Sequence, residues 1–364
     1  MTSAVAVDLG KTGCRAVLWD DGVPAHPLGR VHEVPGAPGL ATADGVAAAR
    51  AAVRAAVLPL LERVPAFRPD ALCVGAAGAA SAPEAARDLA LRLLEDLPAQ
   101  EVAVTSDAVT AHAGALGTRP GVVLALGTGS VAIGIGDDGT YARVDGWGPW
   151  LGDEGSGAWI GAAGLRAALR AHDGRGPATA LLAAAAERFG DPERLPAALD
   201  RDGNPARTAA SFAPDVARVA AAGDDRAAAV LREAAAALGE AVLAAARRIG
   251  GAAAPSAAPT GPPAGRPPLA PPAPASGTGA APLPVALTGG LAGLGEPLLG
   301  PLRACLAGSP LALDVRPALG DPLDGARLLA LDASAPHEPH VARVRRSASF
   351  TTVPTPPVTP PVVA

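Results

Sequence analysis

The chain of 364 residues is poor in aromatic side chains, which make up 2% of it, and has a single lysine among its 30 Lys and Arg residues. A core built from this composition must consist mainly of Ala, Val and Leu. The net charge is −5 and the body of the chain has no dense basic block, which argues against a nucleic-acid-binding surface. No run of about 18 or more uncharged apolar residues occurs, so we expect no membrane span.

Cysteine is also scarce. Cys14, Cys73 and Cys305 are odd in number and lie far apart, which excludes a CxxC metal or redox motif and is typical of reduced thiols in a cytosol. The sequence opens without the basic start and apolar stretch of a signal peptide. We therefore expect a cytoplasmic protein.

Glycine and proline are abundant: 44 Gly and 39 Pro residues form about 23% of the chain, against roughly 12% in average proteins. Two stretches concentrate them, 251–284 and 334–364, and the first carries a single charge. Such segments bury too little apolar surface to offset the entropy of ordering them. We expect a disordered insertion at 251–284 and a disordered tail at 334–364, with His337 and His340 lying in the tail without partners.

The rest of the chain alternates strand and helix patterns. Residues 4–8 and 15–20 predict a β-hairpin, and residues 122–135 predict a second one, so each half opens in the same way. Between and after the hairpins the spacing of apolar residues predicts helices, which indicates an α/β fold. We expect an N-terminal lobe at 1–112 and a C-terminal lobe at 113–333.

Three glycine clusters lie at strand ends. The first is Asp8-Leu-Gly-Lys-Thr12, the second Gly127-Thr-Gly-Ser130, and the third contains Gly289 and Gly290. Backbone amides in such turns suit phosphate oxygens, and Asp8 is placed to hold a hydrated Mg²⁺. Taken singly, each cluster also fits an ordinary turn.

Together, these clusters resemble the two phosphate motifs and the adenosine motif of the actin, sugar kinase and Hsp70 superfamily. A further block, Asp145-Gly-Trp-Gly148 followed by Leu151-Gly-Asp-Glu-Gly-Ser-Gly157, is similar to the signature of N-acetylglucosamine kinases, in the family shared with the BadF-type ATPases. The resemblance implies a two-lobed actin-like ATPase (ribonuclease H-like) fold, each lobe a mixed sheet flanked by helices, that binds ATP and Mg²⁺.

The resemblance also implies site residues. Those expected to bind ATP are Gly10, Lys11, Thr12, Gly127, Thr128, Gly129, Gly289 and Gly290. Those expected to bind the sugar are Thr42, Ser130, Val131, Gly146, Trp147, Gly148 and Asp153. Asp107, at the end of an expected strand, matches the carboxylate that accepts the proton of the sugar hydroxyl; its alternative role is to cap the following helix. Trp147, Trp150 and Trp159 lie close in sequence and favour a binding wall, with core packing as the alternative.

The function implied is ATP-dependent phosphorylation of an amino sugar or N-acetylated sugar. An ATPase of the BadF type that activates a partner and a non-catalytic sugar-binding regulator are the alternatives. Where N-acetylglucosamine kinases place Thr-Asn near a sugar hydroxyl, this chain has Thr42-Ala43-Asp44, so the identity of the sugar stays open. We expect a small-molecule sugar as partner, with no nucleic acid or membrane, and a homodimer is left open.

Overall fold

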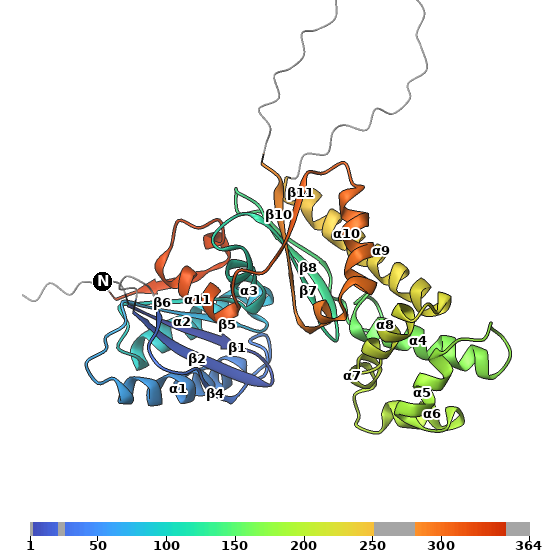
Figure 1. Ribbon diagram of the computed structural model, residues 1–364. Coiled ribbons are helices and arrows are strands. Elements are labelled where there is room, and N and C mark those ends of the chain that lie inside the picture. The colour runs from blue at the N-terminus through green and yellow to red at the C-terminus, as the bar shows by residue number, and fades with distance from the viewer. Residues whose placement is uncertain (1–2, 21–25, 251–280, 347–364) are drawn as a thin grey trace, which may run out of the picture.

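The computed structural model describes residues 3–20, 26–250 and 281–346, which form two lobes, each built on one sheet (Figure 1). The strand order is β12-β6-β5-β1-β2-β3 in the first sheet, where β4 also pairs with β2, and β11-β10-β7-β8-β9 in the second. The strands of the first sheet are β1 (Ser3–Leu9), β2 (Gly13–Asp20), β3 (His26–Pro27), β4 (His32–Pro35), β5 (Ala71–Ala76), β6 (Glu101–Ser106) and β12 (Ala342–Arg345). No helix in these ranges is long and apolar enough to cross a membrane.

The first sheet is covered on both faces. Val5 and Val7 of β1 pack against α1 (Gly45–Arg63) and α2 (Pro83–Asp96), whereas Ala4 and Ala6 pack against α3 (Asp107–Leu116) and α11 (Pro322–Leu331). Alternate side chains of a strand point to opposite faces, so an apolar run such as this one fills two layers at once. The expected hairpin is present as β1 and β2, which pair antiparallel.

The second lobe is a mixed sheet with most of its helices on one side. Strands β7 (Gly121–Leu126), β8 (Ser130–Ile135) and β9 (Tyr141–Asp145) form an antiparallel meander, and β10 (Leu283–Thr288) runs parallel to β7 and to β11 (Leu313–Pro317). The helices are α4 (Gly157–His172), α5 (Leu181–Phe189), α6 (Leu195–Asp200), α7 (Pro205–Ala210), α8 (Ala213–Ala221), α9 (Asp225–Arg248) and α10 (Glu296–Ala307). Because β10 begins at Leu283, the last residues of the expected insertion 251–284 belong to a strand, while 251–280 lie outside the described residues.

Helices α3 and α11 touch backbone to backbone. A Cβ atom at Gly325 would overlap the carbonyl oxygen of Thr110, and one at Gly114 would overlap that of Asp321. Helix α11 also packs on β1 and β5. The expectation that the C-terminal lobe spans 113–333 is therefore wrong for α11. This helix lies on the first lobe, where the two glycines allow it to approach α3 closely.

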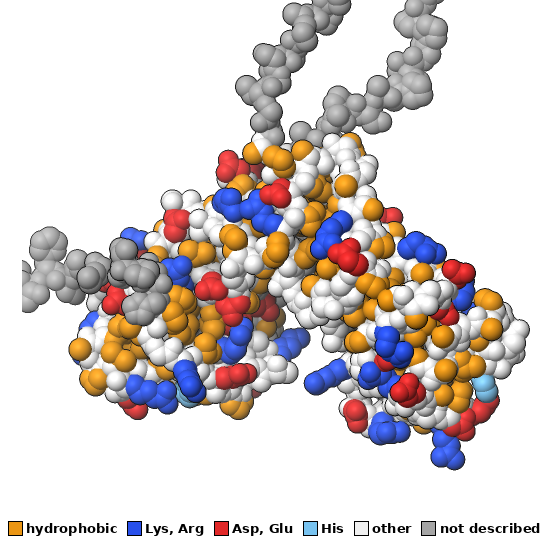
Figure 2. Space-filling view, viewed as in Figure 1, with side chains coloured by type: hydrophobic (Ala, Val, Ile, Leu, Met, Phe, Trp, Pro, Cys, Tyr) orange, Lys and Arg blue, Asp and Glu red, His pale blue; other side chains and the backbone are white. Residues whose placement is uncertain are grey.

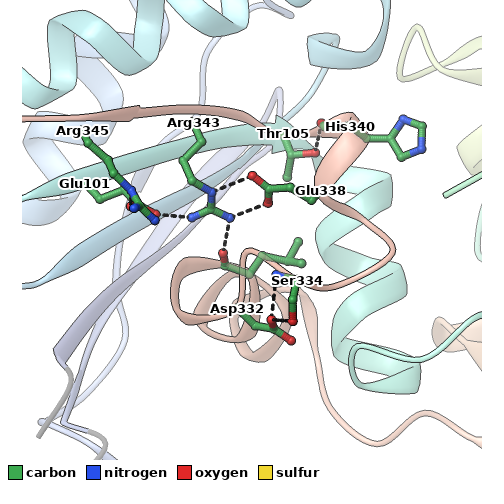
Figure 3. Close-up of polar contacts among 9 residues, drawn as sticks. Glu101, Thr105, Asp332, Ser334, Glu338, His340, Arg343 and Arg345 are labelled. Atoms are coloured by element: carbon green, nitrogen blue, oxygen red, sulfur yellow. Dashed lines mark hydrogen bonds and ion pairs between the residues drawn. The ribbon is translucent and has the colours of Figure 1, made fainter. Parts of the chain in front are cut away.

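The expectation of a disordered tail is wrong for residues 334–346. Strand β12 pairs antiparallel with the edge strand β6 of the first sheet. The largely buried Arg343 donates to Glu338 at 2.7 and 2.8 Å, to the carbonyl of Leu329 at 2.8 Å, and also to Glu101 (Figure 3). The pairing of β12 with β6 and the buried ion pairs of Arg343 offset the entropy cost of ordering this proline-containing segment. Residues 347–364 of that tail lie outside the described residues.

Two histidines expected to lack partners join this segment to both lobes. His112 Nε2 lies 2.9 Å from the carbonyl of Gly121, which can only accept, so Nε2 carries the proton and His112 Nδ1 accepts from His337 Nε2 at 2.9 Å. His340 Nε2 lies 2.7 Å from the carbonyl of Gly139, in the turn between β8 and β9. The chain from 334 to 346 therefore holds the second lobe's hairpin against the first lobe.

We expect Gly325→Ala to lower the free energy of unfolding by about 1–3 kcal/mol, because the added methyl group must push α11 away from α3. Urea unfolding followed by circular dichroism measures this change. Gly293→Ala, in the turn that follows β10, is the matched control, since no atom lies within 4 Å of the added Cβ, and it should be neutral or stabilising. Equal effects of the two substitutions would contradict the close contact.

The buried histidine pair predicts a loss of stability in mild acid. Burial lowers the pKa of His112 to about 4, and burial together with the neighbouring His112 and His340 lowers the pKa of His337 to about 3. The unfolded chain binds protons near pH 6.5, so the stabilisation is complete above that pH and is lost as the pH falls towards 4.

The free energy of unfolding should therefore decrease between pH 7 and pH 5 in the wild type. His112→Gln should be less stable at pH 7 but should show a flatter pH dependence, measured by urea unfolding at each pH. His172→Gln, at an exposed site beside Glu193, is the control. An unchanged slope in His112→Gln would show that the pair does not carry the effect.

Candidate functional site

A cavity of about 550 Å³ lies between the two lobes, and Figure 2 shows the molecule hollowed there. Both lobes contribute side chains to its wall. The polar side chains in that wall are those of Asp8, Ser81, Ser106, Asp107, Tyr141 and Arg143. Gly78, Val131, Gly146 and Pro322 also line it. The structure thus brings the first glycine cluster, the expected catalytic carboxylate and the start of the Gly-Trp-Gly loop to one space.

Asp107 is the first residue of α3, at the point where β6 ends. Ser106 caps the helix, because its hydroxyl oxygen accepts from the Val109 amide at 3.2 Å. Ser106, and not Asp107, therefore has the capping role that was the alternative for Asp107. Burial raises the pKa of the Asp107 carboxyl and the charge of Asp8 adds to this, while a 2.9 Å hydrogen bond from the Ala108 amide opposes the shift. This carboxylate lines the cleft and is more basic than an ordinary aspartate.

The first glycine turn joins β1 to β2. Gly10 donates its amide to the carbonyl of Gly13 at 2.9 Å, and Gly36 donates to the carbonyl of Thr12 at 3.1 Å. A Cβ at Gly36 would overlap the carbonyl oxygen of Gly10. Lys11 and Thr12 are exposed at the tip. The turn is thus supported from behind by a glycine that the sequence analysis did not identify, and it presents Lys11 and Thr12 outward.

Asp8 is ion-paired. Arg15 donates to Asp8 Oδ2 from Nε at 3.2 Å and from Nη2 at 2.7 Å, and its Nη1 lies 3.5 Å from Asp321. No group of three metal-ligating side chains occurs in the part of the chain that the structure describes. Mg²⁺ is commonly held by one or two carboxylates together with water and substrate phosphates. Asp8 and Asp107 in one cavity fit that mode of binding, and they do not form a complete protein cage.

The second glycine turn, between β7 and β8, rests on the start of α4. The first amides of that helix donate to the turn, Gly157 to the carbonyl of Gly127 at 2.9 Å and Ala158 to that of Thr128 at 3.1 Å. Ser156 caps the helix through the Trp159 amide at 3.2 Å. Since the free amides of a helix start are thereby satisfied, α4 fixes the turn and does not bind an anion there itself.

The third glycine cluster lies beside the second turn. Gly289 has a φ of +95°, which favours glycine, and a Cβ there would overlap the carbonyl oxygen of Leu126 at the end of β7. No atom lies within 4 Å of a Cβ built at Gly290. Gly289 therefore brings the expected adenosine motif against the expected phosphate turn and leaves open space at Gly290.

The loop after β9 is closed by its own carboxylates. Asp145 accepts from the amides of Asp153 and Glu154, both at 2.8 Å, and Asp153 accepts from the amide of Gly148 at 3.2 Å. Asp145 and Asp153 have φ values of +61° and +55°, which are unusual outside glycine. Trp147, in the middle of the loop, is 64% exposed. The loop is thus preformed, with Asp145 as the residue that shapes it.

Five of the seven expected sugar-binding residues do not line the cleft cavity, namely Thr42, Ser130, Trp147, Gly148 and Asp153. The Ser130 hydroxyl is buried and donates to the carbonyl of Glu154 at 2.8 Å, so it supports the same loop. The Thr42 hydroxyl donates to the carbonyl of Gly39 at 2.9 Å on the exposed surface of the first lobe. Of the remaining expected residues, Val131 and Gly146 line the cavity that contains Asp107, whereas Asp153 lines a separate one.

Arg143 and Tyr141, both on β9, line the cleft and were not identified from the sequence. Arg143 donates to the carbonyls of Asp145, at 3.2 Å, and Gly146, and its guanidinium lies 4.8 Å from the centre of the Trp147 ring. Burial raises the pKa of Tyr141. The available signal was the alternation along β9: positions 141, 143 and 145 share one face of the strand that leads into the loop.

The sequence is similar in part to two curated sugar kinases. The N-acetylmuramic acid/N-acetylglucosamine kinase of Clostridium acetobutylicum is 33% identical over 117 residues, which are 31% of this chain and 36% of the relative. The N-acetyl-D-glucosamine kinase of Dictyostelium discoideum is 38% identical over 79 residues, 21% of this chain and 25% of the relative. The chain thus matches about a third or less of the length of these curated relatives.

A crystal structure from Chromobacterium violaceum, provisionally assigned as an N-acetylglucosamine kinase, is similar along nearly its whole length. It is 28% identical, has a TM-score of 0.59, and the match covers 91% of this chain and 99% of that one. The two-lobed fold expected from the resemblance is confirmed. The sequence also matches the BadF/BadG/BcrA/BcrD ATPase family over residues 5–260, most of its length, and the chain belongs to that family.

Proposed function

We propose that the protein transfers the γ-phosphoryl group of ATP to a hydroxyl group of an amino sugar or N-acetylated sugar. The observation that carries the proposal is the position of Asp107, a carboxylate with a raised pKa in the cavity that also contains Asp8 and the start of the Gly-Trp-Gly loop. The sugar kinase names of the relatives support it. In this proposal the acceptor is a small molecule, and the enzyme acts in the cytoplasm with reduced cysteines.

Asp107 is proposed to accept the proton of the attacking hydroxyl. Phosphoryl transfer depends mostly on positioning and on neutralising phosphate charge, and a base within hydrogen-bond reach of the hydroxyl orients that hydroxyl and accepts its proton. The raised pKa makes the Asp107 carboxylate a stronger base than an ordinary aspartate. The amides of the two glycine turns and the ammonium of Lys11 are proposed to bind the phosphates, with Gly289 and Gly290 beside the adenosine.

Mg²⁺, when bound at Asp8 through water, would supply charge neutralisation for the ATP phosphates. The loop at 145–148 is proposed to hold the sugar so that one hydroxyl faces Asp107. Closure of the lobes would exclude water from the cleft, so that transfer to the sugar outruns hydrolysis of ATP. The contact of Arg143 with the loop backbone fixes the sugar site before the ligand arrives.

We expect Asp107→Asn to lower kcat by about 10²–10⁴-fold, because the amide cannot accept the proton, while the KM for ATP changes little. A coupled assay of sugar-dependent ADP release measures this, with N-acetylglucosamine, glucosamine and glucose as acceptors. Asp137→Asn, in the exposed turn between β8 and β9, is the control. Turnover of ATP by the wild type without any sugar would instead favour the ATPase alternative, and an unimpaired Asp107→Asn would remove its proposed role.

Arg143→Gln should raise the KM for the sugar about tenfold and leave the KM for ATP nearly unchanged, because the loop carbonyls lose a charged donor. Arg143→Lys keeps the charge but not the planar fork, so it should recover only part of the loss. Tryptophan fluorescence, compared with that of Trp147→Phe because the chain has four tryptophans, reports the loop independently of turnover. Arg175→Gln, at an exposed site beyond α4, is the control. Equal changes in both KM values would indicate a general loss of structure.

A further inference from the structure

A polar cavity of about 680 Å³ lies in the second lobe, between the end of α5 and the helices α6 and α7. Three arginines, Arg188, Arg201 and Arg207, line it, and Asp202 is the acidic residue of the same wall. None of these residues lines the cleft cavity that contains Asp107. The proposed transfer reaction gives them no role, and the size of the cavity is that of a small-ligand site.

The charge of the wall is positive. Arg188 Nε donates to Asp215 Oδ2 at 2.6 Å, which holds that guanidinium in place. The guanidinium groups of Arg201 and Arg207 have no hydrogen bond or ion pair to any residue that the structure describes, and Asp202 offsets only one of them. Positive groups gathered with too few counter-charges attract an anion, and a bound anion would remove their mutual repulsion.

The neutral polar groups of the cavity are oriented by the backbone of α7. Asn204 Oδ1 accepts from the Arg207 amide at 3.1 Å, so the NH₂ group of Asn204 is left to donate. The hydroxyls of Thr208 and Ser211 donate to the carbonyls of Asn204 and Thr208, at 3.2 and 2.7 Å. Their oxygens are thereby left to accept. The cavity thus combines donors that suit an anion with acceptors that suit hydroxyl groups.

Helix α7 stands on a firm base. A Cβ atom at Gly161 of α4 would overlap the carbonyl oxygen of Ala209, so the backbones of α4 and α7 touch. Ala209 itself is buried. Arg207 and Thr208 therefore project from a helix whose backbone is already fixed. A ligand that binds to them does not have to order the helix, which lowers the entropy cost of binding.

We propose that this cavity is a second binding site, outside the cleft, for a phosphorylated sugar. Guanidinium groups bind phosphate oxygens through paired hydrogen bonds, and several of them together match a dianion. The oxygens of Thr208, Ser211 and Asp202 would accept from the sugar hydroxyls. The Phe189 ring, whose centre lies 5.9 Å from that of Phe212, adds an apolar surface on which a face of the sugar can pack. Inorganic phosphate would use only the guanidinium and amide donors.

The test is calorimetric titration of the full-length protein with glucosamine 6-phosphate and, separately, with inorganic phosphate. Arg201→Gln and Arg207→Gln should each weaken binding of glucosamine 6-phosphate about tenfold, because each removes a charged donor. Arg232→Gln, at an exposed site on α9, is the matched control and should leave the affinity unchanged. An affinity that neither Arg201→Gln nor Arg207→Gln alters would overturn the proposal.

Binding in the cleft would be distinguishable from binding at this cavity. Lys11→Gln changes the cleft, so a loss of affinity in Lys11→Gln with none in Arg207→Gln would place the ligand in the cleft and overturn the proposal. Two binding events, of which Arg207→Gln removes one, would support it. Equal affinities for inorganic phosphate and glucosamine 6-phosphate would overturn the assignment of a sugar. The titration needs no turnover, so its outcome does not depend on the proposed function.

Discussion

The contact between α3 and α11 is the constraint on which the site depends. Gly114 and Gly325 let the two helix backbones touch, and this contact fixes how closely α3 lies against α11. Asp107 stands at that beginning, and the first residue of α11, Pro322, forms part of the cleft wall. A side chain at either glycine would move the carboxylate with the helix. Stability of the first lobe and placement of its reactive group are therefore set by the same pair of backbones.

The opposite wall of the cleft is positioned by different means. There the first amides of α4 donate hydrogen bonds to the turn at 127–128, and the backbone of Gly289 lies close against the carbonyl of Leu126. Carboxylate and guanidinium groups then shape the loop after β9, with Asp145 bonded to two amides and Arg143 to two carbonyls. Few side chains here need to move for a ligand to bind, so the site is largely preformed.

The glycine turns, the alternation of strand and helix and the strand-end position of Asp107 could all be predicted, because each is encoded by a few neighbouring residues. Contacts between distant residues could not. Arg343 and Glu101 are 242 positions apart, and nothing local indicates that they meet, so proline content misled us about residues 334–346. The capping role of Ser106 and the cleft position of Arg143 likewise depend on geometry. The order of the motifs along the sequence indicated the fold, whereas the course of the chain between the motifs could not be predicted.

The pairing of β12 with β6 makes the first lobe discontinuous in sequence. Its central strands are synthesised early, but the strand that covers the edge of β6 emerges only after the entire second lobe. During synthesis β6 therefore presents unpaired backbone groups for the time needed to add more than half of the chain, which is the situation in which edge strands recruit other chains. The ion pairs of Arg343 with Glu101 and Glu338 then close that edge last. The last described strand, β12, therefore affects both the order in which the first lobe folds and its final stability.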